Sequence, residues 1–233
     1  MVLVHGTLGN AVDNWLGLAP YLAERGWCVH SFDYGKLPGL PFFHGLGPME
    51  ESSAELAAAV DEVRAETGAA EVDIVGHSQG GVLPRHYLRH HPGAADAVHT
   101  LVGIAPNTNG TTLGGLTALL DHFPAVRDLL TGLAPALTQQ VAGSGFMTEL
   151  NEGGYTVPGV AYTVIATRYD EVVTPWESQF IHENGVDNVL LQELCPRHLS
   201  GHLTIALADP LAFRVTANAL DPAHAEPVSC GSG

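Results

Sequence analysis

The sequence predicts an α/β fold, in which a mostly parallel sheet of about six strands carries helices on both faces. Short apolar runs typical of buried strands alternate with helical patterns along the whole chain. The chain has 233 residues, of which 45% are hydrophobic and 15% charged, and this globular composition comes with enough length for a packed core. We therefore expect a single domain over residues 1–233.

Three strands are predicted in the first half of the chain, with two helices between them. The strands are expected at Val2–His5, Cys28–Tyr34 and Val72–Val75. The first helix, Asp13–Arg25, has apolar residues at helical spacing and a stop signal at Gly26. The second helix is expected to begin at Ser52, because Ser52 and Glu55 have the spacing of a capping box, and to end at Gly68.

The second half of the chain continues the pattern with one interruption. Strands are predicted at Val98–Ile104, Val160–Ala166 and Asn188–Leu194, and a closing helix at Pro210–Leu220. Segment 107–150 breaks the alternation, and its apolar residues recur at helical spacing: Leu113, Leu116, Leu119, Leu120, Phe123, Val126, Leu129, Leu130, Leu133 and Leu137. The segment is either a cap or lid over an apolar site, or a set of crossover helices packed on the sheet.

The charge and the hydropathy of the chain exclude two kinds of partner. The formal net charge is −16, and so acidic a surface repels nucleic acid and anionic lipid. No apolar run approaches the roughly 18 residues that a bilayer-spanning helix requires. We therefore expect no nucleic-acid partner and no transmembrane segment.

The most informative motif is the pentapeptide Gly76-His77-Ser78-Gln79-Gly80, which follows a predicted strand and precedes a predicted helix. A Gly-x-Ser-x-Gly between a strand and a helix is the nucleophile elbow of an α/β-hydrolase, in which the serine hydroxyl stands above the sheet. Gly76 and Gly80 meet the requirement for small residues on either side of so tight a turn. Ser78 is therefore the candidate nucleophile.

A serine nucleophile needs a general base and an acid that orients the base, and in this fold they follow the serine in the order acid, then histidine. Asp170 lies at the carboxyl end of the strand predicted at Val160–Ala166, so it is the favoured acid. Glu171, the next residue, is the second candidate. Asp187 precedes a predicted strand instead of following one, which makes it a poor candidate.

Four histidines follow Asp170 in the chain, and His202 fits the role of base best. It lies in a loop after the last predicted strand and immediately before an apolar run. His198 is the alternative, whereas His182 lies before the last strand and His224 lies in the tail. His198 and His202 also have the spacing of a helical metal pair, but Gly201 weakens a helix there and no glutamate follows His198. We therefore expect no metal ion.

The oxyanion of the reaction needs two backbone N–H donors in fixed positions. One is the N–H of Gln79, the residue after the nucleophile. The other is the N–H of Thr7, in the loop that follows the first strand. Gly6 and Gly9 would let this loop approach a substrate closely, and the side chains of Thr7 and Gln79 are not required.

Together these motifs resemble the extracellular lipases of actinobacteria, in the lipase class 2 branch of the α/β-hydrolases. The resemblance rests on segments spread over nearly the whole chain: 4–7, 26–35, 76–81, 167–175, and His202 with Asp209 and Pro210. It implies a triad of Ser78, Asp170 and His202, an oxyanion hole at Thr7 and Gln79, secretion, and hydrolysis of acyl esters.

We therefore interpret the chain as a carboxylic ester hydrolase that needs no cofactor, with triacylglycerol lipase as the favoured activity and contact with lipid interfaces as an expectation. A short-chain esterase, a polyesterase or a phospholipase is an alternative, because the elbow does not determine acyl-chain length. A non-catalytic binding protein of the same fold is disfavoured, since such proteins usually lose a triad residue.

The three cysteines allow one disulfide with one residue left over. We expect a bridge between Cys195 and Cys230 that tethers the tail, with Cys28 unpaired; inert buried thiols are the alternative. The chain begins inside a predicted strand and shows no signal peptide. The resemblance implies that a preceding segment, often with a cysteine that would pair with Cys28, is missing here.

Overall fold

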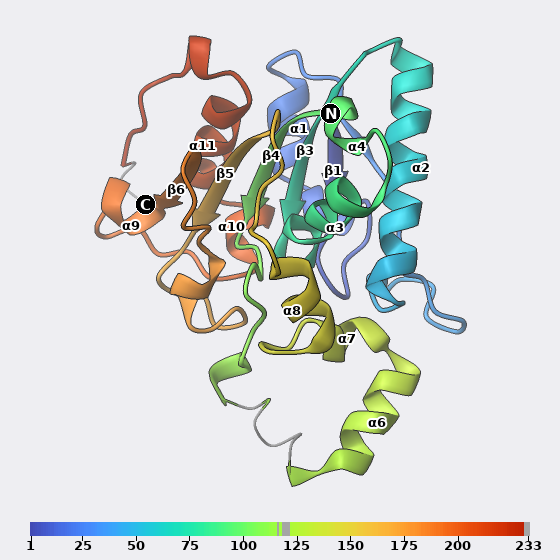
Figure 1. Ribbon diagram of the computed structural model, residues 1–233. Coiled ribbons are helices and arrows are strands. Elements are labelled where there is room, and N and C mark those ends of the chain that lie inside the picture. Colours follow the sequence, from blue (N-terminus) through green and yellow to red (C-terminus); the bar gives the residue numbers. More distant parts are fainter. Residues whose placement is uncertain (116, 118–121, 231–233) are drawn as a thin grey trace.

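The computed structural model describes residues 1–115, 117 and 122–230 and contains one six-stranded sheet (Figure 1). The strand order is β2-β1-β3-β4-β5-β6, and every neighbouring pair is parallel. The strands are β1 (Val2–Val4), β2 (His30–Ser31), β3 (Val72–His77), β4 (Val98–Ile104), β5 (Ala161–Ala166) and β6 (Val186–Leu190). The predicted fold class, strand number and strand direction are confirmed.

Helices cover both faces of this sheet, as predicted. On one face lie α2 (Met49–Thr67), α3 (Leu83–His90) and α4 (Ala94–Ala97). On the other lie η1 (Asp13–Trp15), α1 (Leu18–Ala23), α10 (Thr204–Leu207) and α11 (Pro210–Leu220). The remaining short helices among the described residues outside segment 107–150 are η2 (Ser78–Gly81), η4 (Trp176–Gln179), α9 (Leu191–Leu194) and η5 (Pro222–His224).

The strands alternate their side chains between two hydrophobic clusters, one on each face of the sheet. Val2, Val4 and Ile74 belong to the cluster beneath α2 and α3. Leu3 and Val75 belong to the cluster beneath α1 and α11. This period of two is the expected consequence of strand geometry, and burial on both faces explains why the strands read as continuous apolar runs.

Three predicted boundaries are wrong. The second strand covers only His30–Ser31 of the predicted Cys28–Tyr34. The last strand ends at Leu190, and the apolar residues that follow it form α9, because short apolar runs do not distinguish a strand from a buried helix. Helix α2 begins at Met49, so Ser52 is not a cap; its hydroxyl donates to the carbonyl of Pro48 inside the first turn.

Segment 107–150 forms a group of short helices near the carboxyl ends of the strands: η3 (Leu113–Gly115), α6 (Pro124–Leu133), α7 (Pro135–Gln139) and α8 (Gly145–Asn151). Helix α8 packs into the core through Met147 and Leu150. Helix α6 buries none of its residues and projects away from the sheet in Figure 1. The predicted positions Leu116, Leu119 and Leu120 lie outside the described residues.

Two further sequence expectations concern the bilayer and the tail. None of the helices in the described part of the chain has the length and apolar character needed to cross a membrane. The predicted bridge between Cys195 and Cys230 is present, with Cα atoms 5.4 Å apart, and Cys28 is free and exposed. The bridge joins the tail to the segment that follows α9.

Breaking this bridge in a Cys230→Ser variant should lower the free energy of unfolding by about 4 kcal/mol, because it closes a loop of 35 residues in the unfolded chain. Urea denaturation followed by circular dichroism measures the change. Cys28→Ser is the matched control and should alter stability by no more than about 0.5 kcal/mol. A loss below about 1 kcal/mol in Cys230→Ser would show that packing, and not the bridge, holds the tail.

Candidate active site

Ser78 occupies the sharp turn between β3 and η2, at the carboxyl end of a central strand. Its backbone has φ of +54°, the strained left-handed conformation that a nucleophile elbow requires. A Cβ atom on Gly76 would lie 1.8 Å from the carbonyl oxygen of Gly80, and one on Gly80 would lie 1.9 Å from that of Val4. Both motif glycines are therefore required by backbone contact.

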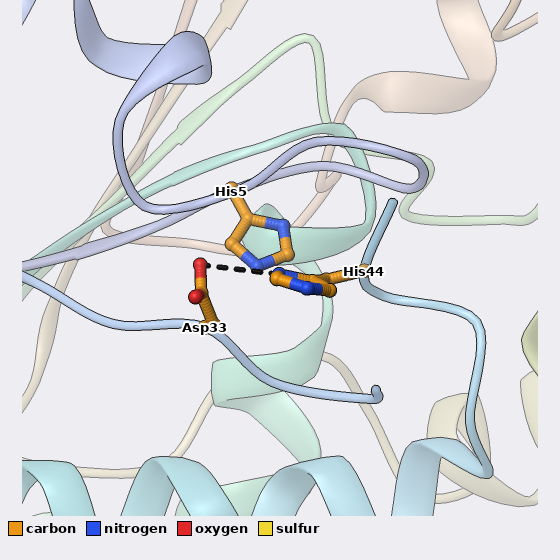
Figure 2. Close-up of side chains that lie close together, drawn as sticks. All are labelled: His5, Asp33 and His44. Atoms are coloured by element: carbon orange, nitrogen blue, oxygen red, sulfur yellow. Dashed lines mark ion pairs between the residues drawn. The ribbon is translucent and has the colours of Figure 1, made fainter. Parts of the chain in front are cut away.

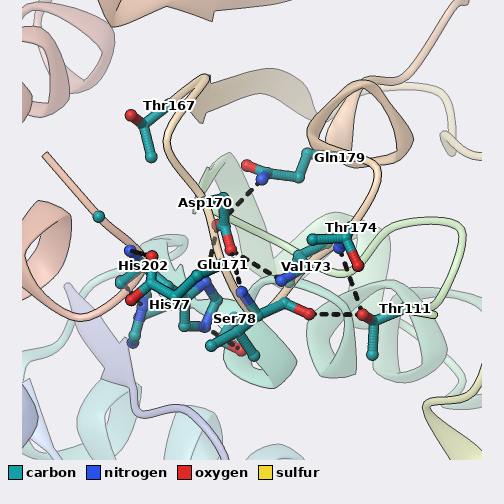
Figure 3. Close-up of polar contacts among 12 residues, drawn as sticks. His77, Ser78, Thr111, Thr167, Asp170, Glu171, Val173, Thr174, Gln179 and His202 are labelled. Atoms are coloured by element: carbon teal, nitrogen blue, oxygen red, sulfur yellow. Dashed lines mark hydrogen bonds and ion pairs between the residues drawn. The ribbon is translucent and has the colours of Figure 1, made fainter. Parts of the chain in front are cut away.

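The structure brings Ser78, His202 and Asp170 into one chain of hydrogen bonds (Figure 3). The Nδ1–H of His202 donates to Asp170 Oδ2 at 2.7 Å. Nε2 of the same ring therefore carries the lone pair and accepts from the hydroxyl of Ser78 at 2.9 Å. All three residues are buried, between 3% and 7% exposed. The arrangement gives a serine hydroxyl a general base and gives that base an orienting carboxylate.

Asp170 is held by four donors, which fix the position of both carboxylate oxygens. Oδ1 accepts from the backbone N–H groups of Val172 at 2.9 Å and Val173 at 2.7 Å. Oδ2 accepts from Nε2 of Gln179 at 3.0 Å in addition to the histidine. These contacts favour the ionised carboxylate, which is the form that orients an imidazole.

The second candidates for acid and base lie elsewhere. Glu171 accepts from the backbone N–H of His202 at 3.1 Å, so it contacts the loop of the base and not its ring. Nε2 of His198 lies 2.7 Å from Asp209, whose other oxygen caps α11 at the backbone N–H of Leu211. His198 and His202 therefore have different partners, and they do not form the metal pair that their spacing allows.

The two residues predicted for the oxyanion hole contact each other through their side chains. The hydroxyl of Thr7 donates to Oε1 of Gln79 at 2.7 Å and accepts from Nε2 of Gln140 at 2.9 Å. Asn107 donates to Oε1 of Gln140 at 2.9 Å. Sequence analysis missed Gln140 and Asn107. Their amides link segment 107–150 to the loop that carries Thr7.

The first loop also passes very close to the nucleophile. A Cβ atom on Gly6 would lie 3.1 Å from Cβ of Ser78, so the glycine is needed for this approach. The N–H of Thr7 donates to none of the described residues. It is thus available to an oxygen of a bound substrate.

His77, the second residue of the motif, supports the loop of the base from below. Its Nε2–H donates to the backbone carbonyl of His202 at 2.9 Å, and the two rings lie 4.8 Å apart. Complete burial lowers the pKa of His77 to about 3, and the neighbouring His202 ring acts in the same direction. Sequence analysis missed this role, although a polar residue buried between two motif glycines is a usable signal.

The lowered pKa of His77 predicts that stability falls in mild acid. Between pH 6.5 and about 3 the unfolded chain binds a proton at His77 that the folded chain does not, so the free energy of unfolding falls as the pH falls. The slope from this residue approaches about 1.4 kcal/mol per pH unit. Urea denaturation of the wild type and of His77→Gln, which keeps a side-chain donor but does not titrate, measures it. Equal slopes for both proteins would contradict the prediction.

A cavity of about 550 Å³ opens above Ser78 and His202. Thr7, Asn107 and Gln140 supply polar groups to its wall. Six leucines line the rest and are all at least a third exposed: Leu8, Leu16, Leu113, Leu137, Leu203 and Leu207. A buried polar centre with an apolar, open rim suits a substrate that has a polar reacting group on an apolar chain.

Comparison with known families agrees with this geometry. Residues 1–156 match the model of a family described as the alpha/beta hydrolase fold. The chain belongs to this family.

Several characterised relatives are lipases. The chain is 34% identical to a triacylglycerol lipase of Pseudarthrobacter phenanthrenivorans over 106 residues, which are 43% of this chain and 31% of that protein. It is 27% identical to lipase B of Pseudozyma antarctica over 186 residues, covering 76% of this chain and 50% of that protein. The chain thus spans between about a third and a half of the length of these relatives.

Solved structures with the same fold include Aspergillus fumigatus lipase B, with a TM-score of 0.75 and 24% identity over 98% of this chain and 53% of that one. The mature form of the Bacillus licheniformis lipase BlEst2 has a TM-score of 0.61 and 18% identity, over 81% of this chain and 82% of that one. At these identities the likeness concerns the fold.

Proposed function

We propose that this chain is a carboxylic ester hydrolase in which Ser78 is the nucleophile, His202 the general base and Asp170 the orienting acid. The observation that carries the proposal is the hydrogen-bond chain from Asp170 through His202 to Ser78, set in the wall of a cavity. In the proposed mechanism Ser78 Oγ attacks the ester carbonyl and passes its proton to Nε2 of His202. Asp170 stabilises the resulting imidazolium.

The negative charge that develops on the carbonyl oxygen requires donors already in place. We assign this role to the backbone N–H groups of Thr7 and Gln79. The side-chain bond between these residues, at 2.7 Å, supports the assignment because it holds the two backbone segments together. His202 then donates its proton to the leaving alcohol. Water, activated by the same histidine, releases the acyl group.

The favoured substrate class is a triacylglycerol or another ester with a long acyl chain. Exposed leucines at the rim of the cavity support this choice, since they offer an apolar surface to an acyl chain or to a lipid interface. The relatives named triacylglycerol lipase support it independently. A short-chain esterase, a polyesterase or a phospholipase is the alternative, and a non-catalytic role is disfavoured by the intact hydrogen-bond chain.

The remaining expectations belong to this proposal. Residues 1–233 would act as one catalytic domain, and segment 107–150 would serve as a cap. Thr111, Leu113 and Gln140 of that segment line the cavity, which supports a cap, whereas α8 packs in the core and acts as an ordinary crossover helix. The disulfide favours an oxidising, extracellular location. We also retain the likeness to actinobacterial lipases of class 2 as a hypothesis.

Activity on p-nitrophenyl esters from acetate to palmitate tests the substrate class, and emulsified triolein tests lipase activity directly. We expect kcat/KM to rise with chain length. In Leu137→Asp it should fall by about 10-fold for palmitate, because a charge replaces an apolar contact in the cavity, and should change little for acetate. Leu199→Asp is the matched control, since Leu199 is 76% exposed and lies outside the cavity lining. A series that peaks at acetate would favour the short-chain esterase.

A further inference from the structure

A second cluster of polar side chains lies behind the loop that carries Thr7 (Figure 2). His5 follows β1, Asp33 follows β2, and His44 lies in the loop before α2. One ligand atom from each side chain lies within 4.8 Å of the other two. None of the three residues lines the cavity above Ser78, so the cluster is separate from the proposed catalytic centre.

The ring of His5 is completely buried and leaves one nitrogen without a partner. Its Nδ1–H donates to the carbonyl of Gly6 at 2.8 Å. Because a carbonyl only accepts, Nε2 carries the lone pair, and this atom has no hydrogen-bond partner in the described structure. Burial lowers the pKa of His5 to about 4, so the lone pair is free at neutral pH.

The ring of His44, which is 5% exposed, presents the same chemistry toward the same point. Its Nε2–H donates to the carbonyl of Pro41 at 3.2 Å, which leaves a lone pair on Nδ1. Nδ1 lies 3.2 Å from Oδ1 of Asp33, yet it forms no hydrogen bond in the described structure. A lone pair that faces a carboxylate oxygen is repelled unless a positive charge, either a proton or a cation, lies at this position.

We propose that Nε2 of His5, Nδ1 of His44 and the carboxylate of Asp33 bind a divalent transition-metal cation, of which Zn²⁺ is the best match. Two imidazoles and a carboxylate are a ligand set typical of zinc. Zinc bonds of about 2.0–2.2 Å place two tetrahedral ligands about 3.4 Å apart, close to the 3.2 Å between His44 and Asp33. The side chain of Asp33 is 28% exposed, so water can complete the coordination.

The bound cation would join three segments that already contact one another. The hydroxyl of Tyr34, next to Asp33, donates to the carbonyl of His5 at 2.6 Å. The backbone of His44 accepts from Leu8 at 2.8 Å and donates to Gly9 at 3.1 Å. A metal ion here would hold the Gly6–Gly9 turn against the loop before α2 and would stabilise the folded chain by mass action.

The test is Zn²⁺ titration of the full chain after removal of metals by a chelator. Calorimetry should give one tight site per chain, and the melting temperature should rise with zinc concentration. Cobalt should give the intense visible bands of a tetrahedral nitrogen and oxygen site. His44→Gln and Asp33→Asn should each weaken binding by at least about 10-fold and remove the zinc-dependent rise in melting temperature. Stability and spectra are independent of ester hydrolysis, so these readouts stand even if the proposed activity is wrong.

Two variants guard against misreading. His90→Gln removes one ring of the stacked pair His86 and His90, a different place where zinc can bind two imidazoles, and should leave the tight site intact. Using both Asp33→Asn and His44→Gln avoids dependence on one variant that fails to fold. The proposal is overturned if the wild type binds no zinc, which would assign the position to a proton. It is also overturned if binding survives in both ligand variants or disappears in His90→Gln.

Discussion

Replacement of Ser78 by alanine should lower ester hydrolysis by about 10⁶-fold, the effect of removing the nucleophile in a serine protease, and leave the fold intact. The serine hydroxyl is the atom that forms the acyl-enzyme, and no other described side chain contacts Nε2 of His202. Alanine differs only by that oxygen and tolerates the φ of +54° no worse than serine does. Steady-state hydrolysis of a p-nitrophenyl ester measures the loss.

Covalent labelling separates loss of the nucleophile from loss of the fold. A phosphonate ester should label the wild type once per chain and should not label Ser78→Ala, while both proteins unfold at the same urea concentration. Ser200→Ala is the matched control, because Ser200 is a buried serine that precedes His202 by two residues and lies outside the cavity lining. Normal turnover by Ser78→Ala, or labelling of it at another serine, would refute the proposed mechanism.

The three residues of the candidate triad were predictable because each follows a strand of a parallel sheet. The carboxyl ends of β3 and β5 meet at one edge of the sheet, which brings Ser78 and Asp170 together. His202 follows β6 and α9 by a longer path, but its place in the chain order restricts the choice to few histidines. Motif spacing and strand topology are both readable from sequence.

Gln140, Asn107 and the cluster around His44 were not predictable in the same way. Gln140 reaches Thr7 from 133 positions away, through a segment whose path over the sheet depends on packing and not on any local pattern. His44 lies in a loop rich in glycine and proline, which has no periodicity to place its side chains. Such contacts depend on tertiary structure, and a lone polar residue in a loop carries no sequence signal.

Asp170→Asn should lower kcat by roughly 10⁴-fold, as the equivalent change does in a serine protease. Asparagine presents an N–H where the carboxylate now accepts from Nδ1 of His202. The imidazole then turns to the tautomer that carries its proton on Nε2, and it can no longer accept the proton of Ser78. Stability should change less than activity, because Oδ1 keeps its bonds from Val172 and Val173. Comparison of kcat with the urea midpoint separates the two effects.

Glu171→Gln distinguishes an orienting carboxylate from a merely nearby one. Glu171 bonds the backbone N–H of His202 at 3.1 Å, and glutamine retains an acceptor oxygen for that bond. Its loss of kcat should therefore stay within about 10-fold, the equivalent of one hydrogen bond. The negative charge is the same distance along the chain in both variants, so the difference between them isolates the contact with the imidazole ring. A larger loss in Glu171→Gln than in Asp170→Asn would reverse the assignment of the acid.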